Sequence, residues 1–186
     1  MSSPLHKALK KHSGKNLFDV KRHPRGVGGL TGFVMVWSEA LVLFHQLDGS
    51  AFCLNGYSVI CSDDVSGFRT FDRDQYWQRR FIRLRKLQPA APVGVLVTDW
   101  RSLFESAVSC FPLVVIHTER KRPDVCYVGE VFKVSDSTVT IHDLDSNCEW
   151  QKPRRFKFSD ITMVGVRRWL FQRTGCDCTK KESSLT

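Results

Sequence analysis

Hydrophobic and polar residues alternate along two separate stretches of this chain. An alternation with a period of two predicts β-strands that bury one face. The predicted strands of the first stretch cover residues 32–38, 41–47, 51–61 and 65–70. Those of the second stretch cover residues 112–118, 125–135, 138–144, 154–158 and 161–168. Gly56 interrupts the run 51–61 and predicts a bulge or sharp bend in that strand.

Two other segments have a helical pattern instead. Apolar residues recur three and four positions apart in 72–87, with acids near the start and bases near the end. That charge order favours a helix, because the helix dipole attracts acids to the N-terminus and bases to the C-terminus. A second helix is predicted from about residue 99 to 110, capped by Thr98 or Asp99.

The two β-rich stretches are related in sequence. Residues 32–48 align without a gap with residues 129–145, and seven of the seventeen aligned positions are identical. The shared residues are mostly Gly, Val and Leu, together with turn-forming Ser and Asp, which a strongly bent strand pair needs. The chain is therefore expected to hold two copies of one small β-unit.

These patterns predict a mainly β protein with short helices, and they divide the chain into five parts. We expect a basic flexible N-terminal segment, a first β-unit, a basic helix with a linker, a second unit of one helix and five strands, and a disordered tail. The expected boundaries are 1–27, 28–71, 72–98, 99–172 and 173–186.

The second unit resembles the Sm-like (LSm) small β-barrel. The similarity lies in a strand with an inward Gly129, a short acidic turn at Asp136, the apolar strand 138–144 and a closing strand after Asp160 and Ile161. The first unit repeats most of this pattern. The resemblance implies two tandem Sm-like barrels joined by a helical linker region, although an SH3-like barrel of another family fits nearly as well. Both turns lack the Asn of RNA-binding Sm proteins, so a uridine pocket is not implied.

Charge divides the chain in a different way. The net charge is +9, and three segments carry most of the positive charge: 1–25, 69–87 and 152–181. The remainder is acidic, so basic surfaces are added to a mildly acidic scaffold, which favours an anionic partner. No secretory signal and no apolar run long enough to span a membrane is present, so we expect a cytoplasmic protein whose seven cysteines are free thiols. Cys53, Cys61, Cys110 and Cys126 are interpreted as small buried apolar residues.

Candidate catalytic or metal-binding residues are few. His45 and His142 occupy the same repeat position, and could form a paired site or simply lie on the solvent face of each strand. Cys176 and Cys178 lack the second ligand pair that a structural zinc site needs. Asp63, Asp64 and Asp160 fit turns better than acid–base catalysis. We therefore expect no catalytic residue, no metal and no cofactor, and we interpret the chain as a non-enzyme.

The remaining signal is the mixture of basic and aromatic residues. Basic side chains on a small barrel suit a phosphate backbone, and neighbouring rings suit stacked bases. The candidate nucleic-acid-binding residues are Arg79, Arg80, Arg83, Lys152, Arg154 and Arg155. Alternation places Phe156 and Phe158 in the core instead. The hypothesis is a binding module that contacts RNA or DNA non-specifically. The alternative is a protein-interaction or scaffold protein that binds a protein partner or a second copy, with no nucleic-acid role.

Overall fold

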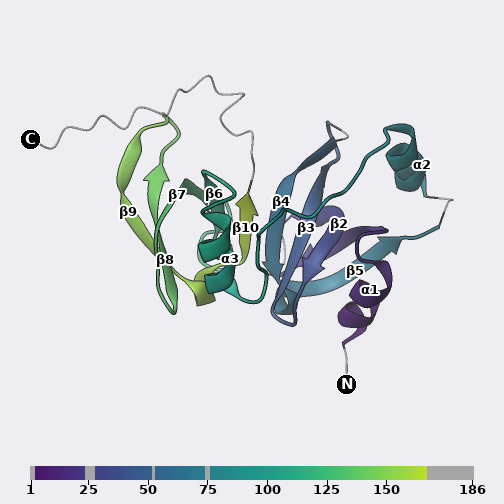
Figure 1. Cartoon of the computed structure of the whole chain (residues 1–186), viewed down its shortest axis with the longest axis horizontal. Coiled ribbons are helices and arrows are strands. Elements are labelled where there is room, and N and C mark those ends of the chain that lie inside the picture. The colour runs from purple at the N-terminus through teal and green to yellow at the C-terminus, as the bar shows by residue number, and fades with distance from the viewer. Residues whose placement is uncertain (1–2, 24–27, 52, 74–75, 167–186) are drawn as a thin grey trace, which may run out of the picture.

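The computed structural model describes residues 3–23, 28–51, 53–73 and 76–166 (Figure 1). The helices in this part of the chain are α1 (Pro4–His12), α2 (Trp77–Leu84) and α3 (Trp100–Ala107). The first five strands are β1 (Leu17–Arg22), β2 (Leu30–Trp37), β3 (Leu41–Asp48), β4 (Cys53–Cys61) and β5 (Val65–Phe71). The other five are β6 (Val114–His117), β7 (Cys126–Val134), β8 (Thr138–Leu144), β9 (Trp150–Lys157) and β10 (Met163–Val166). Single 3₁₀ turns at Ser62–Asp64 and Phe158–Asp160 precede β5 and β10.

All ten strands belong to one antiparallel sheet, in the order β5-β1-β2-β3-β4-β10-β6-β7-β8-β9. We call α1 to β5 the first half and α3 to β10 the second half. Each half has a helix followed by five strands, and each places its fifth strand beside its first. The two halves therefore share one strand order, and they lie at the two ends of the long axis in Figure 1.

The N-terminal segment differs from its prediction. Residues 1–27 were expected to be flexible, but they contain α1 and β1. The Ser3 hydroxyl accepts a hydrogen bond from the His6 N–H at 3.2 Å, and Pro4 occupies the first turn, where its missing N–H costs nothing. Leu5 and Leu9 then pack into the core of the first half. α1 is a short amphipathic helix that buries these two leucines and leaves its lysines exposed.

The sequence repeat corresponds to a repeated backbone device. A Cβ on Gly32 would lie 2.6 Å from the His45 carbonyl oxygen, and one on Gly129 would lie still closer to the His142 carbonyl oxygen. Register shifts follow at equivalent places, between Val34 and Val36 in β2 and between Val131 and Lys133 in β7. Only glycine lets the neighbouring strand approach this closely, so its identity in both copies has a steric cause.

The predicted bend at Gly56 is confirmed. Gly56 has φ +70°, and the β3–β4 pairing skips there, between the pairs His45–Tyr57 and Leu47–Leu54. Other boundaries differ: β9 starts at Trp150, four residues before the predicted strand, and α2 is shorter than the predicted helix. Residues 88–98 are not helical, and the helix of this region, α2, ends at Leu84.

The two halves are joined by strand pairing. β10 of the second half pairs antiparallel with β4 of the first, from Met163 opposite Ile60 to Val166 opposite Tyr57. Leu41, Leu43 and Val59 of the first half are buried in the same core cluster as the apolar stripe of α3. A separate cluster under α1 forms the core of the first half. β3 and β4 of the first half therefore bury one of their faces against the second half.

A buried ion pair spans this joint. The Arg22 guanidinium donates to both oxygens of Glu119, at 2.8 and 2.9 Å, and both side chains are 4% exposed. The Thr162 hydroxyl donates to Glu119 Oε2 at 2.7 Å. Removing either ionic partner would leave an uncompensated buried charge, which costs about 3–5 kcal/mol.

Candidate nucleic-acid interface

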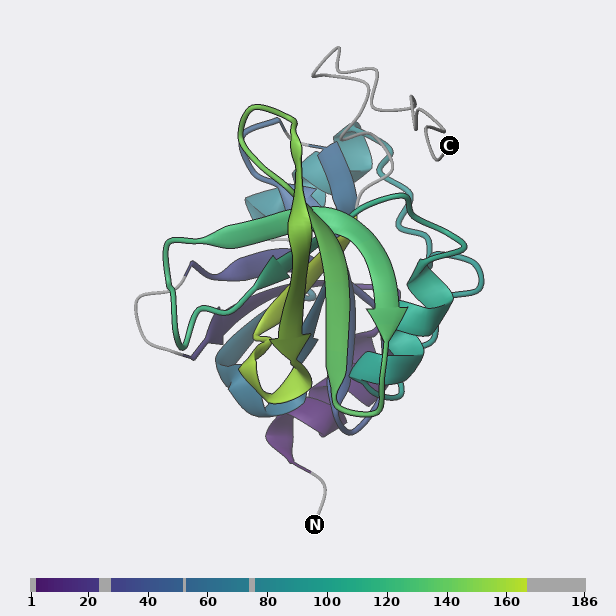
Figure 2. The same ribbon diagram turned by 90° about the vertical axis from the view of Figure 1, so that its left-hand side faces the viewer.

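The strands β7, β8 and β9 of the second half have a core side and a solvent side. Val139, Ile141 and Phe156 are buried on the core side, against α3. Side chains alternate along a strand, so the residues between them lie on the opposite side. We call that opposite side of β7–β9 the outer face. Figure 2, which is viewed from the left of Figure 1, shows these green strands in front of the rest of the molecule.

Three rings form a row across the outer face. Phe132 is the extra residue of the β7 bulge, and its ring stacks on His142 of β8 with centroids 4.9 Å apart. The His142 ring lies 6.3 Å from that of Trp150, at the start of β9. Phe132 is 62% exposed and Trp150 is 45% exposed. We call these three residues the aromatic row; it presents flat π-surfaces to solvent from three adjacent strands.

Cationic side chains flank the aromatic row. The register pairs Thr140 with Lys133 on one side and with Arg155 on the other, so both cations share the outer face. Lys157 lies opposite Thr138 on the same face, and Lys152 is exposed near Trp150. No described residue forms an ion pair with Lys133, Lys152, Arg155 or Lys157. The outer face therefore combines exposed rings with four cations, and it also carries Glu130, opposite His142.

The predicted cationic residues fall into two groups. Lys152, Arg154 and Arg155 lie on β9, the last strand at one edge of the sheet. The three arginines of α2 lie at the far end of the molecule, beyond the other edge (Figure 1). Arg79 donates to Asn16 Oδ1 at 2.8 Å and to the Asp72 carbonyl at 3.1 Å, so it holds α2 to the first half. Arg80 and Arg83 are exposed.

The repeated histidines do not form a pair. His45 stacks on Tyr57 at 4.6 Å, and its Nδ1 accepts the Ala90 N–H at 3.2 Å. Burial lowers the pKa of His45. His142 packs instead between Phe132 and Trp150, in the other half. The two rings make separate contacts, and the paired site considered from the sequence is not formed.

The sequence placed two phenylalanines correctly and missed several residues of the interface. Phe156 is buried and Phe158 packs against the same core, stacked on Phe104. Phe132 was not singled out, because its stacking on His142 depends on a bulge that is not visible in the sequence. The signal that could have found it is the repeat itself, since Phe132 replaces Met35 at the equivalent position.

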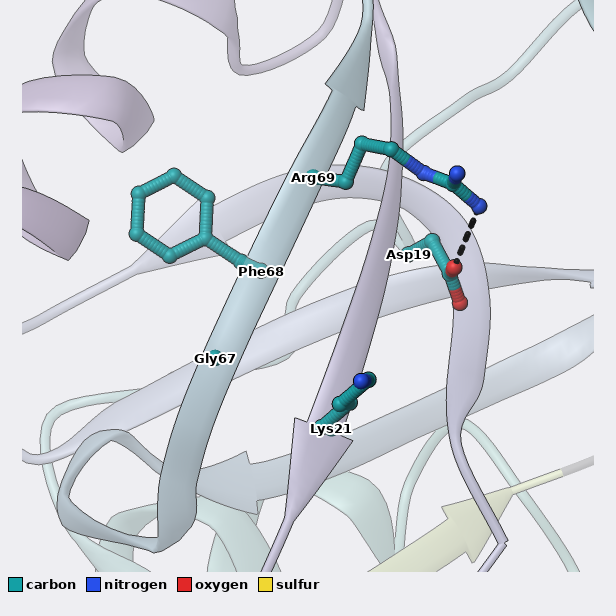
Figure 3. Close-up of a pocket in the computed structure, with 5 residues that line it drawn as sticks. All are labelled: Asp19, Lys21, Gly67, Phe68 and Arg69. Carbon is teal, nitrogen blue, oxygen red and sulfur yellow. Dashed lines mark hydrogen bonds and ion pairs between the residues drawn. The ribbon is translucent and has the colours of Figure 1, made fainter.

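The opposite edge of the sheet has a different surface. A hollow there is lined by Asp19 and Lys21 of β1 and by Gly67, Phe68 and Arg69 of β5 (Figure 3). Arg69 and Asp19 point toward each other, 3.1 Å apart, whereas Phe68 projects to the other side. Here the arginine is already neutralised, so this hollow suits an anion less well than the outer face does.

Other candidate chemistry is limited. Among the described residues, no three His, Cys, Asp or Glu side chains gather closely enough to hold a metal ion. Cys53 and Cys126 are exposed, which corrects their interpretation as buried residues, while Cys61 and Cys110 are half-buried. Cys176, Cys178 and the tail 173–186 lie outside the described residues. None of the described helices has the length and apolar character needed to cross a membrane.

Comparison with known proteins adds no assignment. No protein-family model, no curated protein and no solved structure matches this chain.

Proposed function

We propose that this chain is a non-catalytic binding module built from two Sm-like small β-barrel units, and that the second unit binds single-stranded nucleic acid on its outer face. The shared strand order, the glycine in each copy and the matching bulges support the two-unit architecture. The observation that carries the binding function is the aromatic row, exposed beside Lys152, Arg155 and Lys157 of β9, for which no ion pair with a described residue is found.

The chemistry of the outer face matches that of a flexible strand. Every base has a π-face, so bases stack on exposed rings without regard to sequence, and each stacked base contributes about 1–3 kcal/mol. Lys133, Lys152 and Arg155 supply positive charge for the phosphates between those bases. A protein partner that buried the same rings would have to bring acidic groups to face the surrounding cations.

The test is a titration of labelled single-stranded RNA and DNA at two salt concentrations, followed by fluorescence anisotropy. We expect binding at low salt that weakens as salt rises, because bound cations release counterions from the strand. The double variant Phe132→Ala/Trp150→Ala is expected to lose at least about tenfold in affinity. Its matched control is Trp77→Ala, since Trp77 is 59% exposed but lies on α2, at the far end of the molecule.

Charge variants separate the two basic groups. Lys152→Gln/Arg155→Gln is expected to weaken binding and to lower the salt slope by about 0.7 for each phosphate that is no longer neutralised. Arg80→Gln/Arg83→Gln removes the same charge from α2 and should leave the slope unchanged. Absence of binding at low salt would overturn the proposed function. Binding that both aromatic substitutions leave intact would overturn the outer face as its site.

A further inference from the structure

A second surface feature borders the edge of β9, on the side away from the aromatic row. A pocket of about 200 Å³ lies between the loop after β6 and strand β9. It is lined by Thr118, Lys121, Arg122, Tyr127, Arg154, Arg155, Phe156 and Asp160. Four of these eight residues are cationic. Arg155 belongs both to this pocket and to the outer face, so the two surfaces adjoin along one strand.

Arg154 is held in place before any ligand arrives. Its Nε donates to Asp143 Oδ2 at 2.7 Å, and Asp143 is 7% exposed. The guanidinium carbon lies 4.8 Å from the centre of the Tyr127 ring. No described residue accepts a hydrogen bond from its two Nη groups. The two Nη groups of Arg154 are therefore already oriented and available to donate. Little side-chain freedom is lost when they bind an oxyanion.

The other cations leave the pocket positively charged. Lys121 pairs with Asp160 at 2.7 Å, whereas Arg122 and Arg155 have no acidic partner among the described residues. Four cations against the carboxylates of Asp143 and Asp160 give a net charge of +2. The Thr118 hydroxyl, also at the wall, is a neutral group that can donate. The charge of the pocket therefore suits an anion that carries about two negative charges.

The size of the pocket limits the ligand further. Pockets that enclose a whole small molecule have about 300–1,000 Å³, and this one is smaller. A single tetrahedral oxyanion fits that limit better than a complete nucleotide does. A phosphate monoester carries about −1.5 to −2 charges at neutral pH and three acceptor oxygens. A phosphodiester inside a strand has one charge and two free oxygens, so it would use fewer of the donors.

We infer that this pocket binds a phosphate monoester at the end of the strand whose bases stack on the aromatic row. The inference rests on the proposed function and adds a second requirement to it, a terminal phosphate. Arg154 and Arg122 would donate to the phosphate oxygens, and Arg155 would lie between the terminal phosphate and the first stacked base. Asp143 acts as a positioning residue, because it contacts Arg154 and not the ligand.

The test compares three oligonucleotides of one sequence that carry a 5′-phosphate, a 3′-phosphate or no phosphate. We expect one of the two phosphorylated strands to bind at least about tenfold more tightly than the unphosphorylated strand. Arg154→Lys keeps the positive charge but removes the paired Nη donors, and it should abolish the preference for the phosphorylated strand. Arg80→Gln, on α2, should preserve it.

Asp143→Asn distinguishes positioning from simple charge. Removal of a negative charge would tighten phosphate binding if only the net charge mattered. If Asp143 orients Arg154, the same substitution should reduce the preference for the phosphorylated strand. A gain in that preference would contradict the positioning role of Asp143. Circular dichroism of the variant confirms that the protein is folded before either result is interpreted.

Failure of the pocket and failure of the proposed function give different results. Equal binding of all three strands would overturn the pocket and leave the outer face as the binding site. Absence of binding by all three would overturn the proposed function, and the pocket would then be tested with inorganic phosphate alone. Phosphate-dependent shifts of the Thr118 and Tyr127 amide resonances, which chloride does not produce, would support an anion site. Their absence would overturn it.

Discussion

The same face of the sheet is covered in the first half and exposed to solvent in the second. In the first half, Leu43 and Val59 are buried beneath the core of the second half, and Ala90 lies on His45. In the second half, the equivalent positions hold Thr140 and Arg155, which border open solvent on the outer face. The strand pairs Leu43–Val59 and Thr140–Arg155 match one to one. One backbone design thus serves as an internal joint in one copy and as the proposed binding surface in the other.

The two equivalent strands show how the sequence sets this difference. β4 carries Tyr57, Ser58 and Val59 and accepts β10 as its neighbour. At the matching positions β9 carries Pro153, Arg154 and Arg155 and stays at the edge of the sheet. Proline cannot donate to a new strand, and a run of like charges repels one. Divergence at these positions keeps further copies from pairing with β9.

Substitutions at one pair of equivalent positions in these strands test whether the two faces are differently buried. Val59→Arg places a charge inside an apolar core cluster, at a site with 0% exposure, so we expect a loss of about 3–5 kcal/mol in unfolding free energy. Arg155→Val makes the reverse change on the exposed strand and should alter stability by less than about 0.5 kcal/mol. Urea unfolding measures both. Similar losses for the two variants would show that the faces are not differently buried.

The glycines test whether the two copies share one constraint. Gly32→Ala and Gly129→Ala each push a Cβ against a backbone carbonyl, so each is expected to cost about 1–3 kcal/mol, with the larger loss at Gly129. Gly67→Ala is the control, because a Cβ there meets no atom within 4 Å. Thermal unfolding gives the order. A harmless substitution at either repeated glycine would contradict the close approach.

The pH dependence of stability reports on the covered face. Burial lowers the pKa of His45, so the unfolded chain binds a proton at a higher pH than the folded chain does. This histidine therefore has no effect on stability above about pH 6.5 and lowers stability as the pH falls below that value. His45→Gln should make the stability curve shallower in that acidic range. An unchanged curve would indicate that His45 is not covered.

Thiol labelling gives the smallest effect. Burial, with a contribution from Asp64, raises the pKa of Cys61 to about 11. About 0.1% of that thiol is then ionised at pH 8, so alkylation should be slow. Cys126, on β7 of the open half, is exposed and should be alkylated readily. Peptide mass spectrometry separates the two sites. Rapid alkylation of Cys61 in the folded protein would contradict its coverage.

The sequence was informative about local structure and poor at showing which surfaces are covered. Alternation and the glycine repeat located nine of the strands to within a few residues, because those signals are local. β1 was not predicted, and the two leucines that anchor α1 gave only a weak amphipathic signal among the surrounding lysines. Of the candidate site, the cations of β9 were found. Asp143 and Tyr127 were not, because their contacts with Arg154 depend on strand register and edge position.

The pairing of β4 with β10 also has a consequence for synthesis. β4 ends at Cys61, and β10 begins at Met163, so about a hundred residues separate the two partners in the order of translation. At about 5–20 residues per second, a ribosome needs roughly 5–20 s to make that stretch. Throughout this interval the nascent first half exposes an unpaired strand edge beside Leu41, Leu43 and Val59. Pairing with β10 closes that edge, so the first half reaches its final packing only after most of the second half has been made.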